Sequence, residues 1–259
     1  MRIVIKIGTS TLAYATGHPN IRHIENFCKV VSDIKNAGYE VIIVSSGAVS
    51  MGRGKAAVAE RPTELSMKQA LAAIGQCELM YTYDKYFGEY NHTVAQLLLT
   101  AHNFIDPQQY ENLISTMHKL LEMGVIPLIN ENDTVATQEL NIGDNDTLGA
   151  RVAVSVNADL LVLLSDIDGL YTADPNKHPE AERIARVEEI TPAIEALAGG
   201  SASKVGTGGM TTKIEAAKIA TSAGTDMVIA NGKDPAILYD ILEGKEVGTR
   251  FVGRQPDTR

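Results

Sequence analysis

The sequence predicts an α/β protein, a three-layer αβα sandwich whose central sheet is mostly parallel. Two observations support this. Short apolar runs recur along the 259 residues as continuous stretches rather than alternating ones, which is typical of strands buried on both faces. Segments with helical periodicity lie between these runs, so helices are expected on both faces of the sheet. Because no proline-rich or charge-rich linker divides the chain, we expect a single domain over residues 1–259.

The predicted elements follow one another in βα order. The expected strands are RIVIKI (2–7), EVIIVS (40–45), TVAQLLL (93–99), VIPLIN (125–130), DLLVLLS (159–165) and DMVIA (226–230). Helices are expected near residues 21–37, 63–88, 107–123, 146–157 and 212–223. Gly38, Gly124 and Gly224 stand just past three of these helices, where a left-handed residue commonly ends a helix.

Composition narrows the functional classes. Of the residues, 44% are hydrophobic and 21% charged, the formal net charge is −9 and the isoelectric point is about 5.2. Without a basic stripe we expect no nucleic-acid partner. No stretch has the pattern of a signal peptide or a membrane span, so we expect a soluble, cytoplasmic protein. Cys28 and Cys77 lie in helical segments without metal-ligand spacing and are expected to be buried free thiols.

The stretch GTGGMTTK, residues 206–213, is unusual because three glycines, which have no side chains, precede a lysine. Thr212 and Glu215 have the spacing of a capping box, so the helix is expected to begin near Thr211–Thr212. An anion could bind here, because it would meet glycine backbone amides, the positive end of a helix and the ammonium group of Lys213. The spacing is not that of a Walker A loop, and a phosphate-binding loop and an ordinary surface loop both remain open.

Other unusual residues follow the predicted strands, at the edge of a parallel sheet where ligands collect. The segments are KIGTST, SSGAVSMG, NENDTVAT with GDNDT, and LSDIDGLYTADP. Lys6 lies in an otherwise apolar strand, which costs stability unless its ammonium reaches an anion or water. A lysine that simply extends to solvent at the strand end is the alternative.

Six blocks, KIGTS, SSGAV, INENDTVAT, GDNDTLGA, SDIDGLYTADP and GTGGMTTK, together resemble the amino acid kinase family over nearly the whole chain. The NENDTVAT and GDND pair is similar to the branch that phosphorylates glutamate, rather than those acting on acetylglutamate, aspartate, uridylate or carbamate. GTRF (248–251) fits a closing edge strand of that fold. Longer members continue into an RNA-binding-like PUA module, and the resemblance implies a kinase domain without it.

The resemblance implies transfer of the γ-phosphoryl group of ATP to the γ-carboxylate of L-glutamate, the first step of proline biosynthesis. A carboxylate with a pKa of about 4.3 is already ionised at neutral pH, so no general base is needed. The six histidines all lie outside the six blocks, which agrees with a reaction that needs no general base. Mg²⁺ is expected on ATP oxygens and water, with no protein metal ligand. Proline as a feedback inhibitor and a homodimer or homotetramer are further expectations.

The resemblance also implies roles for individual residues. Lys6 and Lys213 would flank the transferred phosphoryl group, and Asp146 would hold the two ammonium groups in place. Glutamate would contact the residues Ser46, Asp133 and Asn145, with Gly47 and Asp144 beside them. ATP would contact the residues Lys6, Gly8, Ser165, Asp166, Thr207, Gly208, Gly209, Met210, Thr211, Thr212 and Lys213.

Plainer interpretations remain for the acidic residues. Asp133 is a common turn former, Asp144 and Asp146 suit the start of a helix, and Asp166 and Asp168 suit a loop. Two rival functions also stay open: a sibling carboxylate kinase such as one for acetylglutamate, and a non-catalytic nucleotide-binding protein.

Overall fold

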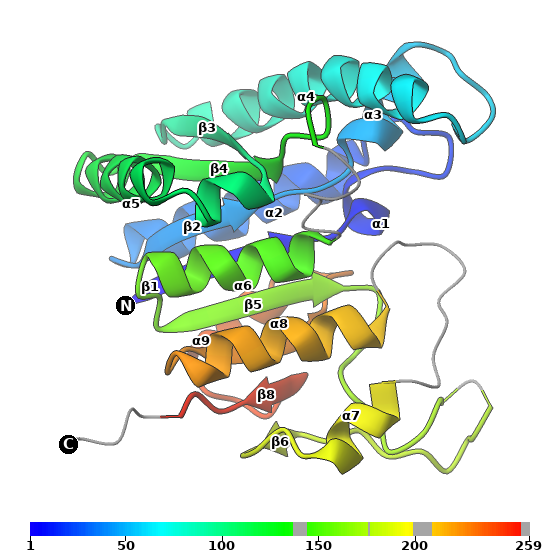
Figure 1. The fold of residues 1–259 in the computed structure, drawn as a ribbon, viewed down its shortest axis with the longest axis vertical. Coiled ribbons are helices and arrows are strands. Elements are labelled where there is room, and N and C mark those ends of the chain that lie inside the picture. The colour runs from blue at the N-terminus through cyan, green and yellow to red at the C-terminus, as the bar shows by residue number, and fades with distance from the viewer. Residues whose placement is uncertain (137–143, 176, 199–208, 255–259) are drawn as a thin grey trace.

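The computed structural model describes residues 1–136, 144–175, 177–198 and 209–254 (Figure 1). The strands are β1 Arg2–Ile7, β2 Glu40–Val44, β3 Val94–Leu99, β4 Ile126–Glu131, β5 Leu160–Ser165, β6 Arg186–Val187, β7 Asp226–Asn231 and β8 Thr249–Phe251. The helices are α1 Thr9–Leu12, α2 Ile21–Asn36, α3 Ala48–Lys55, α4 Leu65–Gly88, the 3₁₀ turn η1 Ala101–Phe104, α5 Pro107–Glu122, α6 Asn145–Ser155, α7 Pro192–Ala198, α8 Met210–Ser222 and α9 Ile237–Leu242.

The described strands form one sheet in the order β3-β4-β2-β1-β5-β7-β8-β6. All neighbouring pairs are parallel except β7 and β8, which run antiparallel. This confirms the predicted mostly parallel sheet. The expectation that GTRF closes the sheet is wrong for the described residues, because β6 pairs with the far side of β8. With only two residues, β6 gives no recognisable pattern in the sequence.

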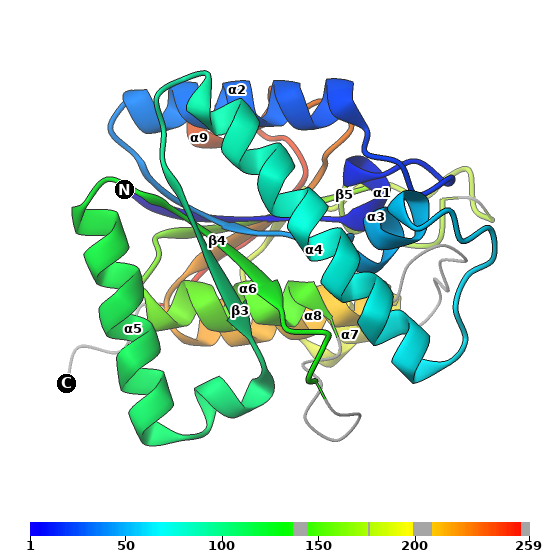
Figure 2. The same cartoon turned by 90° about the horizontal axis from the view of Figure 1, so that it is seen from above.

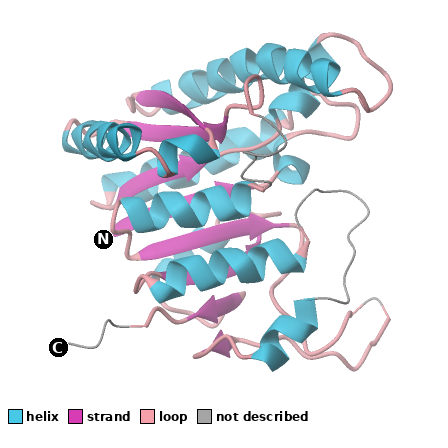
Figure 3. Ribbon diagram, in the orientation of Figure 1, coloured by secondary structure: helices cyan, strands magenta, loops and turns pink. Residues whose placement is uncertain are grey.

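Helices cover both faces of the sheet, as the three-layer prediction requires (Figures 2 and 3). One buried cluster joins α2, α4 and α9 to one face, and a second joins α5, α6 and α8 to the other. Neighbouring residues of a strand belong to different clusters: Ile3 and Ile5 face α2, whereas Val4 faces the α6 side. A strand that is apolar on both faces therefore produces the continuous runs seen in the sequence.

Glycines end the helices where the sequence predicts. Gly38, Gly124 and Gly224 have φ angles of +96°, +72° and +87°, and each follows the last helical turn of α2, α5 or α8. These φ values are left-handed, a conformation that glycine adopts at little cost. The expectation for the cysteines is half wrong, because Cys28 is buried but Cys77 is exposed on α4.

Helices α3 and α4 touch through bare backbone. A Cβ atom added at Gly75 of α4 would lie 1.8 Å from the carbonyl oxygen of Ala48, at the start of α3. One added at Gly52 of α3 would lie 1.8 Å from the carbonyl oxygen of Leu71. Because α3 follows directly from the end of β2, this contact fixes where the SSGAV segment lies.

We expect Gly75→Ala to lower the free energy of unfolding by about 2 kcal/mol or more, because a methyl group forces the two helix backbones apart. Gly88→Ala, on the same helix, is the matched control, because no described residue lies within 4 Å of its added Cβ. It should leave stability unchanged or raise it by up to about 1 kcal/mol, since alanine favours helix. Urea unfolding of both variants tests this, and equal stabilities would refute the close contact.

Candidate active site

Two lysines from distant parts of the chain share one carboxylate. Lys6 comes from β1, Asp146 from the first turn of α6 and Lys213 from the first turn of α8. Lys6 Nζ lies 2.6 Å from Asp146 Oδ1, and Lys213 Nζ lies 2.9 Å from Asp146 Oδ2. All three residues are buried, with relative exposures of 7%, 1% and 4%. The structure thus brings together the three residues that the resemblance singles out for phosphoryl transfer.

The electrostatics of this cluster favour an anion. Burial acts to raise the pKa of Asp146, but Lys6 and Lys213 outweigh it and hold that pKa below its ordinary value. In the described part of the chain, Asp146 is the one carboxylate within ion-pair distance of either lysine. Two ammonium groups and one carboxylate leave a net positive charge in a buried place. A bound anion would neutralise that charge.

The start of α8 differs from the capping-box prediction, which is wrong. Gly209 is the N-cap and the helix begins at Met210, one to two residues earlier than the expected start near Thr211–Thr212. The Thr212 hydroxyl does not cap the helix: it lies 2.8 Å from the Gly209 carbonyl oxygen and 3.2 Å from Asp146 Oδ2. A hydroxyl has one proton to donate, and the shorter of these two contacts is the one to the Gly209 carbonyl oxygen. Thr207 and Gly208, also expected to bind ATP, lie outside the described residues.

Asn145 ties three segments together beside the cluster. Its Nδ2 lies 2.8 Å from the Ser45 carbonyl oxygen, 2.8 Å from Ser46 Oγ and 3.1 Å from Asn130 Oδ1. Ser45 and Ser46 follow β2, and Asn130 is near the end of β4. Asn145 and Ser46, both expected at the glutamate site, are therefore in direct contact. The side-chain oxygen of Asn145 is not used in these bonds.

Sequence reasoning missed the residues that hold this amide in place. Asn130 donates through Nδ2 to Gln76 Oε1 at 2.9 Å, and the Ser45 hydroxyl lies 3.0 Å from the Tyr83 hydroxyl. Gln76 and Tyr83 both come from α4, whose sequence carries no local sign of a site. Asn130 had a signal, because it is a polar residue at the end of an apolar run.

Asp144 and Asp133 occupy different settings. Asp144 is the N-cap of α6 and accepts from the Asp146 backbone N–H at 3.0 Å, so the plainer helix-start interpretation holds for it. Its second oxygen, Oδ2, is buried and has no hydrogen-bond partner among the described residues. Asp133 follows β4 and lines a small hollow with Gln76 and Ala48. Burial raises the pKa of Asp133, which no described ion pair offsets.

The residues expected on the nucleotide side include Gly8, which follows β1, and Ser165 and Asp166 at the end of β5, whereas Gly47, expected beside glutamate, follows β2. A Cβ added at Gly8 would come within 3.9 Å of Lys6 Nζ, so the backbone of Gly8 borders the cluster. Gly47 caps α3 with a φ of +92°, a left-handed conformation that favours glycine. The Ser165 hydroxyl donates to Asp166 Oδ1 at 3.1 Å at the end of β5.

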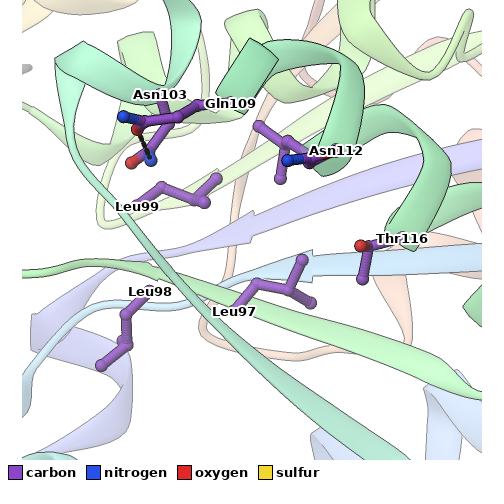
Figure 4. A pocket seen from close by; sticks show the side chains of 8 residues that line it. Leu97, Leu98, Leu99, Asn103, Gln109, Asn112 and Thr116 are labelled. Carbon is purple, nitrogen blue, oxygen red and sulfur yellow. Dashed lines mark hydrogen bonds between the residues drawn. The ribbon is translucent and has the colours of Figure 1, made fainter.

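Another hollow lies away from this cluster. It has a volume of about 330 Å³ and lies between β3 and α5, over the leucines of β3 and beneath the amides of Asn103, Gln109 and Asn112 (Figure 4). Strand β3 is three strands from β1 in the sheet, which is about 14 Å. This hollow is therefore separate from the lysine cluster.

The described residues hold no group of three or more histidine, cysteine, aspartate or glutamate residues suited to a metal ion. No described helix has both the length and the apolar character needed to cross a membrane.

Comparison with known proteins defines the class. The model of the amino acid kinase family matches residues 1–231. Two solved structures share the fold: an isopentenyl phosphate kinase of T. acidophilum (TM-score 0.67, 18% identity, 97% of this chain and 100% of that one) and a carbamate kinase of Giardia lamblia (TM-score 0.67, 18% identity, 98% of each). The chain is thus a phosphotransferase-type α/β protein of the amino acid kinase family.

Closer relatives narrow the family. A glutamate 5-kinase of Clostridium perfringens is 51% identical over 258 residues, covering 98% of this chain and 96% of that protein. One of Listeria monocytogenes is 50% identical over 260 residues, covering 99% and 94%. A glutamate 5-kinase of Carboxydothermus hydrogenoformans is 55% identical over 251 residues, which are 96% of this chain and 67% of that longer protein. This chain belongs, within the family, with the glutamate 5-kinases.

We expect Asp146→Asn to lower the free energy of unfolding by about 3 kcal/mol at neutral pH, because two buried ammonium groups lose their counter-charge. The depressed pKa of Asp146 means that its stabilisation is present above its unfolded pKa and is lost as pH falls through the folded pKa. The difference between the two proteins should therefore shrink in acid.

The control is Asp84→Asn, an exposed carboxylate on α4. It should change stability by no more than about 0.5 kcal/mol. Urea unfolding across pH measures both, and an Asp146→Asn protein as stable as the control would contradict the role of Asp146 as the shared counter-charge of the two lysines.

Proposed function

We propose that the protein transfers the γ-phosphoryl group of ATP to the γ-carboxylate of L-glutamate, giving γ-glutamyl phosphate and ADP, the first step of proline biosynthesis. One observation carries the proposal: Lys6 and Lys213 meet on Asp146 beside the Asn145–Ser46 contact, at the carboxyl edge of the sheet. The half-identity to glutamate 5-kinases supports the choice of acceptor.

The two lysines are proposed to neutralise the phosphoryl group as it moves. Phosphoryl transfer demands positioning and charge stabilisation more than covalent chemistry. Each ammonium group, held in a buried and already oriented place, contributes roughly 3 kcal/mol to the transition state by analogy with oxyanion donors. Asp146 keeps the mutually repelling ammonium groups in position and itself need not touch the substrate. No general base is required, because the acceptor carboxylate is ionised at neutral pH.

Asn145, Ser46 and Asp133 are proposed to bind glutamate. The Asn145 carbonyl and the Ser46 hydroxyl offer both donors and acceptors to a carboxylate or an ammonium. Asp133, when ionised, would pair with the α-ammonium of glutamate, which also relieves the desolvation that raises the pKa of this carboxyl. Such a pair discriminates against an acetylated amine, as in acetylglutamate.

The nucleotide is proposed to lie over Gly8, Ser165 and Asp166, with its phosphates at the N-terminus of α8. Gly209 and the amides of the first turn of α8 suit an anion, and the net positive charge of the cluster adds to this. Mg²⁺ is proposed to be held by nucleotide oxygens and water rather than by protein carboxylates. Because the reaction consumes ATP, we place it in the cytoplasm. We also propose proline, the end product of the pathway, as a feedback inhibitor.

The direct test is a single mixture of protein, ATP, Mg²⁺, L-glutamate and hydroxylamine. The acyl phosphate should be trapped as γ-glutamyl hydroxamate, with acetylglutamate and aspartate far poorer acceptors. Lys6→Ala and Lys213→Ala should each lower kcat by about 10²–10³-fold while the protein stays folded. Equal activity with acetylglutamate would overturn the acceptor, and ATP binding without turnover would favour a non-catalytic protein.

Asp133 is expected to affect glutamate binding and folding stability in opposite directions. Asp133→Asn should raise the KM for glutamate by about tenfold or more, because the α-ammonium loses its ionic partner, and leave the KM for ATP unchanged. The raised pKa of Asp133 means that the fold favours its protonated form, so its contribution to stability is present at low pH and lost as pH rises.

Asp133→Asn should therefore raise the melting temperature at neutral pH, with the gain fading in acid. Steady-state kinetics and thermal unfolding measure the two effects. An unchanged KM for glutamate would remove Asp133 from the acceptor site.

A further inference from the structure

Helix α4 presents one side-chain amide to the acceptor side of the site. Gln76 is partly buried on α4, and its Oε1 accepts from Asn130 Nδ2 at 2.9 Å. Together with Asp133 and Ala48, Gln76 also lines the small hollow beside the end of β4. None of the six sequence blocks contains this residue. The contact with Asn130 uses the oxygen of the Gln76 amide and leaves its NH₂ group for another partner.

A backbone group fixes which way this amide points. The Glu131 backbone N–H can only donate, and its nitrogen lies 2.9 Å from Asn130 Oδ1, so Asn130 must present its oxygen on that side. Asn145 Nδ2 donates to the same oxygen at 3.1 Å. The Asn130 NH₂ group therefore points at Gln76, which must present its own oxygen in turn. Gln76 Nε2, with two N–H donors, has no hydrogen-bond partner in the described part of the chain.

The charge of the hollow decides what kind of donor can hold an anion there. Two of its lining residues, Glu131 and Asp133, are acidic, and the described residues that line it include no lysine or arginine. A carboxylate can be held here only through hydrogen bonds from uncharged groups, which are stronger when the acceptor is ionised. Asn132 also brings an amide, but the described contact that holds it is with the hydroxyl of exposed Thr134. Gln76 is the lining side chain whose donor direction is fixed by the backbone of β4.

The acceptor proposed above brings such a carboxylate. The α-carbon of glutamate carries both an ammonium and a carboxylate, so the group that binds one must lie close to the group that binds the other. Asp133 is the proposed partner of the ammonium, and Gln76 lines the same hollow. The γ-carboxylate has to reach Lys6 and Lys213 to receive the phosphoryl group, so the carboxylate beside Asp133 is the α-carboxylate.

We propose that Gln76 Nε2 donates a hydrogen bond to the α-carboxylate of the acceptor, which makes Gln76 a specificity-determining residue supplied by α4. The inference rests on the proposed function and on the pairing of the α-ammonium with Asp133. It adds a requirement that neither of these contains: the acceptor must carry a carboxylate on the same carbon as its ammonium.

Two analogues of glutamate separate this contact from a purely structural role. 4-Aminobutyrate keeps the ammonium and the carboxylate to be phosphorylated but lacks the α-carboxylate, whereas glutarate keeps both carboxylates and lacks the ammonium. Gln76→Met should lower kcat/KM for glutamate and glutarate by about ten- to hundred-fold, because an ionised group loses a hydrogen bond, and should leave 4-aminobutyrate nearly unchanged. A residue that only holds Asn130 in place would affect all three acceptors alike. Asp133→Asn should show the opposite preference, weakening 4-aminobutyrate and sparing glutarate.

The matched control is Gln69→Met on the same helix. Gln69 does not line the hollow and has no hydrogen bond among the described residues, so kcat/KM for each acceptor should stay within about twofold. Trapped hydroxamate measures turnover, and competitive inhibition of glutamate turnover gives the affinity of an analogue that reacts slowly. If thermal unfolding shows that Gln76→Met does not fold, Gln76→Glu replaces it, because it keeps an oxygen for Asn130 and removes the donor.

The outcomes separate this inference from the function on which it rests. A loss confined to the acceptors that carry the α-carboxylate supports the contact. If the unsubstituted protein phosphorylates glutamate but the Gln76 variant affects the three acceptors equally, or affects none of them, the inference is overturned and the proposed function stands. An unsubstituted protein that does not phosphorylate glutamate overturns both.

Discussion

The structure depends on one buried carboxylate shared by two ammonium groups. Asp146 can satisfy Lys6 and Lys213 together only if β1, α6 and α8 converge at the same place. Removing charges from water costs desolvation free energy, and the attraction within an ion pair offsets that cost only when the geometry of the pair is good. The sheet order supplies that geometry, because β1 and β5 are central neighbours and α6 and α8 pack side by side on one face. Within β1, Lys6 stands between Ile5 and Ile7, both fully buried, so a charged residue at this position is unusual.

The start of α6 joins the two halves of the site. Three consecutive residues do different things there: Asp144 caps the helix, Asn145 reaches Ser46 and Asn130, and Asp146 receives the lysines. A shift of α6 would therefore disturb the phosphoryl side and the acceptor side together. Helix α4 holds the acceptor side in place through two hydrogen bonds, one from Asn130 to Gln76 and one between Ser45 and Tyr83.

The sequence predicted much of this arrangement because its signals are local. Continuous apolar runs identify buried parallel strands, and Gly38, Gly124 and Gly224 mark helix ends through their own backbone preference. The convergence of Lys6, Asp146 and Lys213 came from the resemblance, since nothing local relates residues so far apart. Gln76 and Tyr83 were missed for the same reason. The two-residue strand β6 is too short to have a pattern.

A double-mutant cycle on kcat between Lys6 and Lys213 tests the central claim most directly. If both ammonium groups stabilise one migrating phosphoryl group through a shared carboxylate, the loss in the Lys6→Met/Lys213→Met protein should fall well short of the product of the two single losses. Circular dichroism should show that all three variants are folded. Losses that simply multiply, or a doubly substituted enzyme that turns over as fast as the unsubstituted one, would contradict the account.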